Sequence, residues 1–217
     1  GLTPKAINEL FSLISEKKTC TVTVKTYFVE LYNDQLVDLY WILDQKKTKT
    51  KESPPKLEIK LNANKMVELQ GVVIKDANTP EELMDMFMTG NTMRHTGATK
   101  MNAESSRSHS LFSILIQSYD KTSKKTNIGK LTLVDLAGSE RADKTGAEAE
   151  RLTEAMSINK SLSALGDVIS ALSDGAKFIP YRNNKLTQVM QDSLGGTAKT
   201  LMFVNFSPAD YNSDETV

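Results

Sequence analysis

Asp135 ends an apolar run, 131–134, that the sequence predicts to be a buried strand, and Gly138 follows three residues later. Ligands of open α/β sheets bind at the carboxyl ends of strands, which is where this pair would lie. A carboxylate there can hold a hydrated Mg²⁺, and a glycine N–H can approach a phosphate oxygen closely because no side chain intervenes. The D-x-x-G pattern therefore predicts a metal-phosphate site, but a plain turn after a strand has the same pattern.

A second polar group, Asn-Ala-Glu-Ser-Ser-Arg-Ser-His at 102–109, precedes an alternating strand at 111–116. Serine hydroxyls both donate and accept hydrogen bonds, so they can ligate Mg²⁺, bond a phosphate or position a water. Several hydroxyls beside Arg107 suit a γ-phosphate. A capped turn with a surface arginine explains the same residues equally well.

Composition excludes several classes of protein. Lysine plus arginine and aspartate plus glutamate both number 27, so no overall field favours nucleic acid or membrane. The single cysteine excludes internal disulfides and thiolate metal cages, and two histidines cannot make a zinc site by themselves. No apolar run approaches about 18 residues and no signal peptide is seen, which predicts a soluble, intracellular protein.

Helical and strand patterns alternate along the chain and predict an α/β sheet. The predicted elements are a helix from Thr3-Pro4, a strand over 21–32, a solvated basic loop over 45–55, a helix from Thr79-Pro80 with a capping-box glutamate, strands over 111–116 and 131–134, a long helix over 152–172, a short helix over 186–194 ending at a left-handed Gly195-Gly196 cap, and a last buried strand over 201–206.

Four motifs together carry a specific resemblance. They are Asn-x-x-Ser-Ser-Arg-Ser-His at 102–109, Asp-Leu-Ala-Gly-Ser-Glu at 135–140, Ile-Asn-Lys-Ser-Leu-Ser-Ala-Leu-Gly at 158–166 and Ile-Pro-Tyr-Arg-Asn-Asn-Lys-Leu-Thr at 179–187. Over nearly the whole chain the sequence resembles the kinesin motor domain, and within that family the minus-end-directed C-terminal-motor kinesins, in particular the plant-type calmodulin-binding kinesin. The resemblance implies a P-loop NTPase fold, with a central mostly parallel or mixed sheet flanked by helices on both faces.

The resemblance also implies roles for the polar loop at 102–109, which would be switch I. Asn102 and Ser106 would contact ATP or ADP, Ser106 would also touch Mg²⁺ and the γ-phosphate, and Ser105 would help to position the attacking water. The loop beginning at Asp135 would be switch II.

In switch II, the resemblance implies that Asp135 holds Mg²⁺ through water and that the Gly138 N–H senses the γ-phosphate. Arg107 and Glu140 would form a salt bridge that closes the two switches over the nucleotide. Closure of this kind fits phosphoryl transfer, which depends on positioning and exclusion of water. Asn159 would lie on the helix that relays the switch state to the track.

The implied partner is tubulin on cytoplasmic microtubules, whose acidic surface would meet a basic set of residues: Lys144, Lys160, Lys177, Arg182 and Lys185. An electrostatic interface of this kind associates fast and is sensitive to salt. Any one of these side chains alone is better explained as a charged residue on a solvent-exposed face without a partner protein. The calmodulin-binding segment of the resembling subfamily lies outside this chain.

One family motif is missing. No G-x-x-x-x-G-K-[ST] phosphate loop occurs, and Gly129-Lys130 lacks the upstream glycine and precedes a strand. We therefore expect residues 1–217 to be the C-terminal two-thirds of a motor domain, without the upstream phosphate loop and the downstream last helix and neck. The intact parent would be an ATPase, and the isolated chain would bind nucleotide poorly or not at all.

Two other functions fit parts of the pattern. A non-enzymatic microtubule-binding protein derived from a motor would also lack an intact phosphate loop. A GTPase-like switch would share Asp-x-x-Gly, and Asn159-Lys160 begins the guanine-reading Asn-Lys-x-Asp. Position 162, however, is leucine, so the guanine-binding carboxylate is absent.

Overall fold

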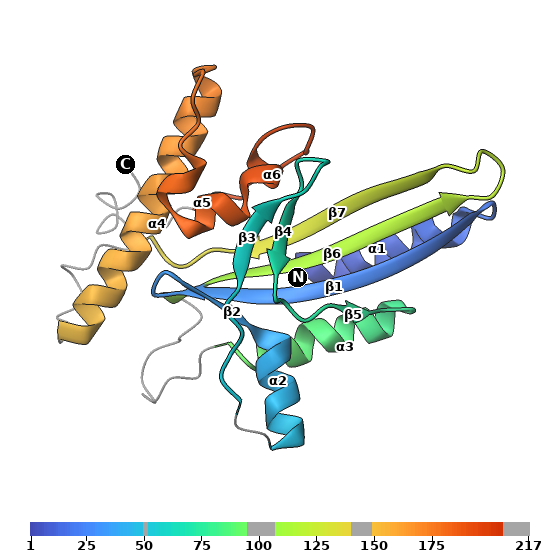
Figure 1. Ribbon diagram of the computed structural model, residues 1–217, viewed down its shortest axis with the longest axis horizontal. Coiled ribbons are helices and arrows are strands. Elements are labelled where there is room, and N and C mark those ends of the chain that lie inside the picture. Colours follow the sequence, from blue (N-terminus) through green and yellow to red (C-terminus); the bar gives the residue numbers. More distant parts are fainter. Residues whose placement is uncertain (50–51, 95–106, 140–148, 206–217) are drawn as a thin grey trace.

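The computed structural model describes residues 1–49, 52–94, 107–139 and 149–205, with side chains of the last range described from residue 154 on (Figure 1). The helices are α1 (Leu2–Glu16), α2 (Leu39–Thr48), α3 (Pro80–Asn91), α4 (Ala149–Ser173), α5 (Lys185–Val189), α6 (Gln191–Leu194) and the 3₁₀ helix η3 (Tyr181–Asn183). The strands are β1 (Cys20–Tyr32), β2 (Gln35–Asp38), β3 (Glu58–Leu61), β4 (Val67–Gln70), β5 (Lys75–Asp76), β6 (His109–Asp120) and β7 (Thr126–Asp135).

The main sheet has the strand order β2-β1-β6-β7, with β5 also paired to β1, and its three long strands are β1, β6 and β7. All pairs of described strands are antiparallel, whereas a mostly parallel or mixed sheet was expected. Short turns account for three of these pairs, β1–β2, β3–β4 and β6–β7, because strands joined by a few residues can pair only in antiparallel fashion. The β1–β2 turn uses Asn33 and Asp34, both with positive φ, as a tight hairpin requires.

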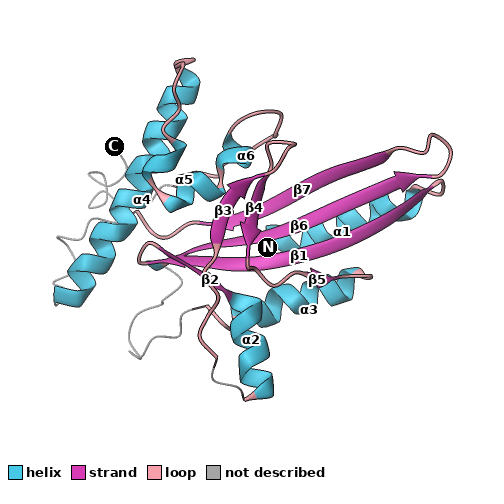
Figure 2. Ribbon diagram, viewed as in Figure 1, coloured by secondary structure: helices cyan, strands magenta, loops and turns pink. Residues whose placement is uncertain are grey.

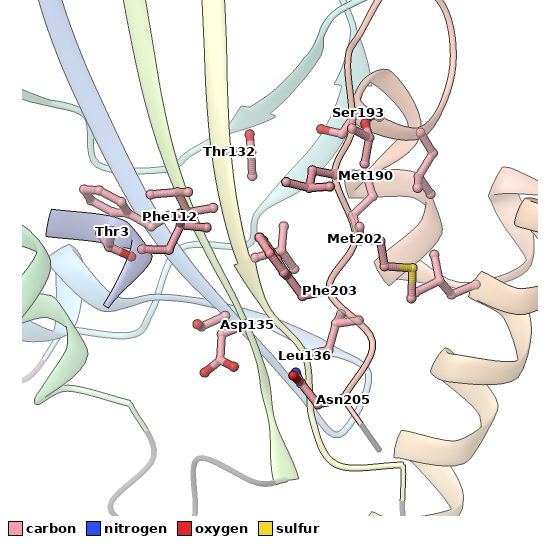
Figure 3. A pocket seen from close by; sticks show the side chains of 18 of the residues that line it. Thr3, Phe112, Thr132, Asp135, Leu136, Met190, Ser193, Met202, Phe203 and Asn205 are labelled. Carbon is pink, nitrogen blue, oxygen red and sulfur yellow. Dashed lines mark hydrogen bonds between the residues drawn. The ribbon is translucent and has the colours of Figure 1, made fainter. Parts of the chain in front are cut away.

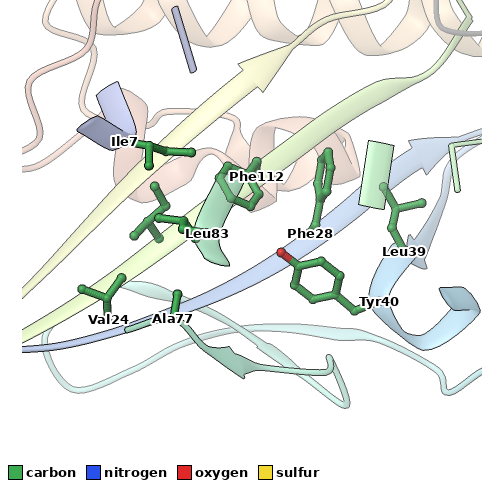
Figure 4. Close-up of a cluster of buried hydrophobic side chains, with 9 residues drawn as sticks. Ile7, Val24, Phe28, Leu39, Tyr40, Ala77, Leu83 and Phe112 are labelled. Atoms are coloured by element: carbon green, nitrogen blue, oxygen red, sulfur yellow. The ribbon is translucent and has the colours of Figure 1, made fainter. Parts of the chain in front are cut away.

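Helices cover both faces of this sheet, as predicted (Figure 2). Alternate residues of β1 point to opposite faces. Phe28 contributes to a core with α1, α2 and α3, in which Tyr40 and Leu83 are also fully buried (Figure 4). Its neighbour Val29 contributes to a second core that contains Leu165 of α4 together with residues of β4 and α5.

The predicted capping box at the start of α3 is present. The Thr79 hydroxyl accepts the Glu82 N–H at 3.1 Å, and the Glu82 carboxylate accepts the Asn78 N–H at 2.8 Å. At the other end of α3, Gly90 lies so close to Phe28 that an added Cβ would be 2.7 Å from the ring. The cap and this close contact fix the helix on the sheet, and the chain then leads directly into Arg94.

The basic loop predicted over 45–55 is partly helical, because α2 extends through Thr48. Asp38 caps this helix by accepting the N–H groups of Tyr40 and Trp41, at 2.9 and 3.1 Å. Lys46 lies in the last turn, where a positive charge interacts favourably with the helix dipole. The lysines led to the prediction of a loop, but two of them lie in the last turn of a short helix whose earlier turns pack on the sheet.

The C-terminal predictions need two corrections. The helix predicted over 186–194 is broken at Met190 into α5 and α6, and the left-handed residue beyond it is Gly196, with φ 71°, while Gly195 is extended. The predicted last strand is absent from 201–205, where Leu201 is 77% exposed. An apolar run becomes a buried strand only beside a paired neighbour, and among the described strands β7 pairs only with β6.

Lys130 of β7 forms a buried ion pair with Asp192 of α6, and the two side chains are 7% and 8% exposed. The Asp192 carboxylate also accepts the N–H of Val67 in β4, at 2.8 Å. Lys130, the nearest approach to a phosphate-loop lysine in this sequence, thus lies inside a strand and joins three elements.

None of the described helices combines the length and apolar character needed to cross a membrane.

Candidate functional site

Asp135 lies at the carboxyl end of β7, as the sequence predicted, with its side chain 68% exposed. Its carboxylate accepts a hydrogen bond from the Arg94 guanidinium at 2.7 Å. Arg94 is 9% exposed and also donates to the carbonyl oxygen of Ser108 at 3.1 Å. One buried arginine therefore fixes the end of β7 relative to the start of β6.

Arg94 was not identified from the sequence. Arg94 lies three residues beyond the end of α3 and belongs to none of the motifs identified in the sequence. Its partners Ser108 and Asp135 are distant in sequence and meet it only through the sheet, where Asp135 stands opposite Ser110. No local pattern could have revealed this contact.

A cavity of about 520 Å³ opens beside Asp135 (Figure 3). Arg94 and Thr3 contribute polar groups to its wall, whereas Phe112 and Phe203 belong to its apolar lining. The cavity runs along β7, from Thr132 to Asp135, on the side where no described strand is paired. Most of the side chains that line it are apolar, and the polar ones lie both beside Asp135 and farther along the cavity, at Thr132 and Ser193.

The residues at this strand end fit a hydrated Mg²⁺. Mg²⁺ keeps several waters and binds proteins through one or two carboxylates, and Asp135 offers an exposed carboxylate of which Arg94 engages one oxygen. The described residues contain no group of three or more histidine, cysteine, aspartate or glutamate side chains that could enclose a metal. A single carboxylate of this kind suits an ion whose other ligands are water and phosphate oxygens.

The two predicted switch segments are described only in part. Gly138 follows β7 and is half-buried, and the N–H of the preceding residue, Ala137, donates to Nδ1 of His109 at 3.1 Å. The remaining predicted residues of this region, Asn102, Ser105, Ser106, Glu140 and the track residue Lys144, lie outside the described residues.

Arg107 forms an ion pair with Glu154 of α4, with 3.2 Å between guanidinium nitrogen and carboxylate oxygen. The predicted partner was Glu140, so the pairing predicted from the resemblance stays a prediction. Both side chains of the observed pair are partly buried, which reduces screening by solvent. Arg107 thus connects the start of β6 directly to α4.

The described members of the basic set predicted to contact the track lie on or beside α4, η3 and α5, which contact one another at one end of the molecule (Figure 1). Lys160 of α4 and Arg182 of η3 are exposed, as is Lys177 in the loop between these two helices. Lys185 is half-buried and donates to the carbonyl oxygen of Asp34 at 2.6 Å. The predicted relay residue, Asn159, is half-buried on α4 beside Lys160.

Comparison with known proteins finds that the kinesin motor domain model matches residues 1–217. The chain is 51% identical to kinesin-like protein KIN-14E of Arabidopsis thaliana and 50% identical to kinesin-like protein KIN-14I of Oryza sativa subsp. japonica. Each match covers 100% of this chain and 17% of the relative.

Among solved structures, the motor domain of the Saccharomyces cerevisiae kinesin-related protein Kar3 is 38% identical, with a TM-score of 0.80. The match covers 100% of this chain and 64% of that chain. The chain therefore spans a small part of its curated relatives and less than two thirds of this solved motor domain.

Proposed function

This chain belongs to the kinesin motor-domain family, and from that premise we propose that the protein containing it is a microtubule-based motor driven by ATP hydrolysis. The observation that carries the proposal is the exposed Asp135 carboxylate, held by buried Arg94 at the mouth of a cavity. In the same molecule, α4 connects this region to an exposed basic surface through Arg107 and Glu154. One helix would thus connect the proposed nucleotide site with the proposed track surface.

In this proposal Asp135 would hold the hydrated Mg²⁺ of Mg-ATP, and the Gly138 N–H would contact the γ-phosphate. Asn102, Ser105 and Ser106, which precede Arg107 in the sequence, would complete the site: Ser106 would bind the metal and Ser105 would position the attacking water. Bound Mg²⁺ supplies neutralisation of the charge that develops on the phosphates. The protein's own contribution is orientation, which Arg94 gives to the Asp135 carboxylate.

Arg107 has two acidic residues available in this proposal. It pairs with Glu154 in the structure, and with nucleotide bound it would pair with Glu140 and close the switch segments over the phosphates. An exchange between the two partners would release Glu154 and so act on α4. Order–disorder changes of switch loops on γ-phosphate binding are a known way to produce such an exchange.

The phosphate loop would come from a preceding segment of the intact motor domain. The outer edge of β7 bears no described strand, and the apolar wall of the cavity beside it would accept one. Isolated residues 1–217 should then bind Mg-ATP poorly or not at all. Calorimetric titration of the isolated chain tests this, and tight Mg²⁺-dependent binding would refute it.

The proposed track is the microtubule, which places the protein on the cytoskeleton. Tubulin is acidic, and Lys160, Lys177 and Arg182 offer exposed positive charge, with Lys144 and Lys185 as further members of the set. Calmodulin or a related calcium sensor would bind a segment outside these residues, as in the plant-type subfamily. We assign to this chain only the track contact.

Microtubule co-sedimentation of the full-length protein, with ADP or with a non-hydrolysable ATP analogue, tests the proposal. A motor should bind microtubules with an affinity that depends on the nucleotide and falls with salt. A non-enzymatic microtubule-binding protein is the second candidate, and a missing or altered phosphate loop in the segment preceding these residues would favour it. It would show the same affinity with either nucleotide and no microtubule-stimulated ATP hydrolysis.

A further inference from the structure

His109, the last residue of the Ser-Ser-Arg-Ser-His motif, connects two segments that are distant in sequence. Its Nδ1 accepts the N–H of Ala137 at 3.1 Å, and its Nε2 lies 2.7 Å from Oγ of Ser161 in α4. The side chain is buried, at 3% exposure. The imidazole therefore spans directly from the backbone that follows Asp135 to the helix that carries the basic surface.

The hydrogen bonds at the imidazole are consistent with only one protonation state. Because a backbone N–H must donate to Nδ1, the proton of the neutral ring is on Nε2 and is donated to Ser161. The Ser161 hydroxyl then donates to the carbonyl oxygen of Ile158, at 2.6 Å. Every donor in this chain of bonds has an acceptor, so the bridge has a defined direction from Ala137 to α4.

The residues around His109 leave little room for water to enter the bridge. The cavity beside the ring measures about 10 Å³, at the lower limit for a single water. One helical turn beyond Ser161, the buried Leu165 packs in the same core cluster as Leu136. Ser161 and Leu165 lie one turn apart on the same face of α4, so the His109 bridge and this core cluster both connect that face to the region where β7 ends.

We propose that His109 is a positioning residue that couples the Ala137–Gly138 backbone to α4, so that a shift of this backbone on nucleotide binding displaces α4 and changes microtubule affinity. The inference rests on the proposed motor function and deepens it. His109 contacts neither phosphate nor metal in this scheme, and its action passes through Ser161. Coupling of this kind is reciprocal, so microtubule binding would also change nucleotide affinity.

The test uses full-length protein and the ratio of microtubule dissociation constants measured with ADP and with a non-hydrolysable ATP analogue. His109→Asn keeps an acceptor at the Nδ1 position and loses Ser161, while His109→Gln keeps a donor at the Nε2 position and loses Ala137. Ser161→Ala removes the far end of the bridge. Each change should reduce the ratio at least about 5-fold, the lower range of allosteric coupling, and Ser161→Thr should restore it.

A matched control removes a hydroxyl from the same strand pair without touching α4. Ser113 of β6 bonds Thr132 of β7 at 3.1 Å, so Ser113→Ala should leave the ratio unchanged. Unchanged ratios in Ser161→Ala and both His109 variants would overturn the inference while leaving the motor function standing. A loss shared by Ser113→Ala, or not restored by Ser161→Thr, would indicate general destabilisation and would also overturn it. Equal affinities in the wild type would refute the motor function itself.

Discussion

At the scale of single residues, Arg94 determines how well Asp135 is placed to hold Mg²⁺. The carboxylate is exposed, so without the guanidinium it would sample several rotamers. Residues that orient metal ligands typically contribute 10- to 100-fold to metal affinity. We therefore expect Arg94→Lys, which loses the two-pronged contact with Asp135 and Ser108, to weaken Mg²⁺ activation of the full-length ATPase by about 10-fold or more.

The measurement is the Mg²⁺ dependence of ATP hydrolysis at fixed ATP concentration. Arg182→Lys on η3 is the matched control, because this arginine is exposed and belongs to an element that contributes none of the contacts described above for the Arg94–Asp135 pair. An unchanged Mg²⁺ requirement in Arg94→Lys would show that Asp135 needs no such support.

His109 gives a prediction about pH. Burial lowers the pKa of His109 from 6.5 to about 4, the charge of Arg94 adds to this effect, and Asp135 opposes it. Arg107 and Asp34 line the small cavity beside the ring. As the pH falls, His109 is therefore protonated near pH 6.5 in the unfolded chain but only near pH 4 in the folded chain.

Stability contributed by the neutral ring is accordingly complete above pH 6.5 and falls as the pH drops toward 4, by roughly 3 kcal/mol in total. Urea unfolding at a series of pH values between 4 and 7 measures this slope. His109→Gln, which cannot titrate, should lose most of it. An equal slope in both proteins would place the titration elsewhere.

At the scale of elements, the ion pair of Lys130 and Asp192 joins β7, α6 and the β3–β4 hairpin. Because both side chains are buried, removing one partner leaves a charge without compensation, which typically costs about 3–5 kcal/mol. Lys130→Met should therefore lower the free energy of unfolding by about that amount, and adding Asp192→Leu should recover part of it.

The control for this change is another strand lysine paired with an aspartate, but on the surface. Lys25 and Asp76 are 3.3 Å apart and about half exposed, so Lys25→Met should cost less than about 1 kcal/mol. Equal losses in the two lysine variants would show that burial of the Lys130 pair is not what matters.

Elements with local signals were predictable from the sequence, and those determined by distant contacts were not. The capping box at Thr79 and the alternation through β6 are local, and both are present. Helix α2 was missed because its lysines read as a loop and its buried face depends on contacts with the sheet, although its cap at Asp38 is a local signal that the prediction did not use. Residues 201–205 read as a buried strand because apolar sequence alone does not reveal whether a paired neighbour is present.

The site divides in the same way. Asp135 could be predicted as a candidate ligand because the apolar strand, the carboxylate and Gly138 follow one another within a few residues of the sequence. Arg94 on Asp135, Glu154 on Arg107 and Ser161 on His109 each join residues that only the fold brings together. A motif can therefore indicate which chemistry a chain performs, but the contacts that would connect it to a track become visible only in three dimensions.

At the scale of the whole molecule, the zero net charge means that any attraction to an acidic track must come from the distribution of charge. Lys160, Lys177 and Arg182 are exposed on or beside contacting elements at the α4 end. Another exposed basic group, Lys121, Lys124 and Lys125, lies in the β6–β7 turn, at the opposite end of the sheet (Figure 1). The two groups allow position to be tested at constant total charge.

Replacing Lys160, Lys177 and Arg182 together by glutamate should weaken microtubule binding of the full-length protein roughly 10-fold or more at low salt, because each exposed pair contributes up to about 1 kcal/mol. The same replacement should reduce the salt dependence of the dissociation constant, since fewer ion pairs remain to be screened. Glutamate at Lys121, Lys124 and Lys125 makes the same change in net charge, and we expect it to leave affinity nearly unaltered. If both triple variants lost affinity equally, attraction would follow total charge, and the α4 end would have no special role in binding the track.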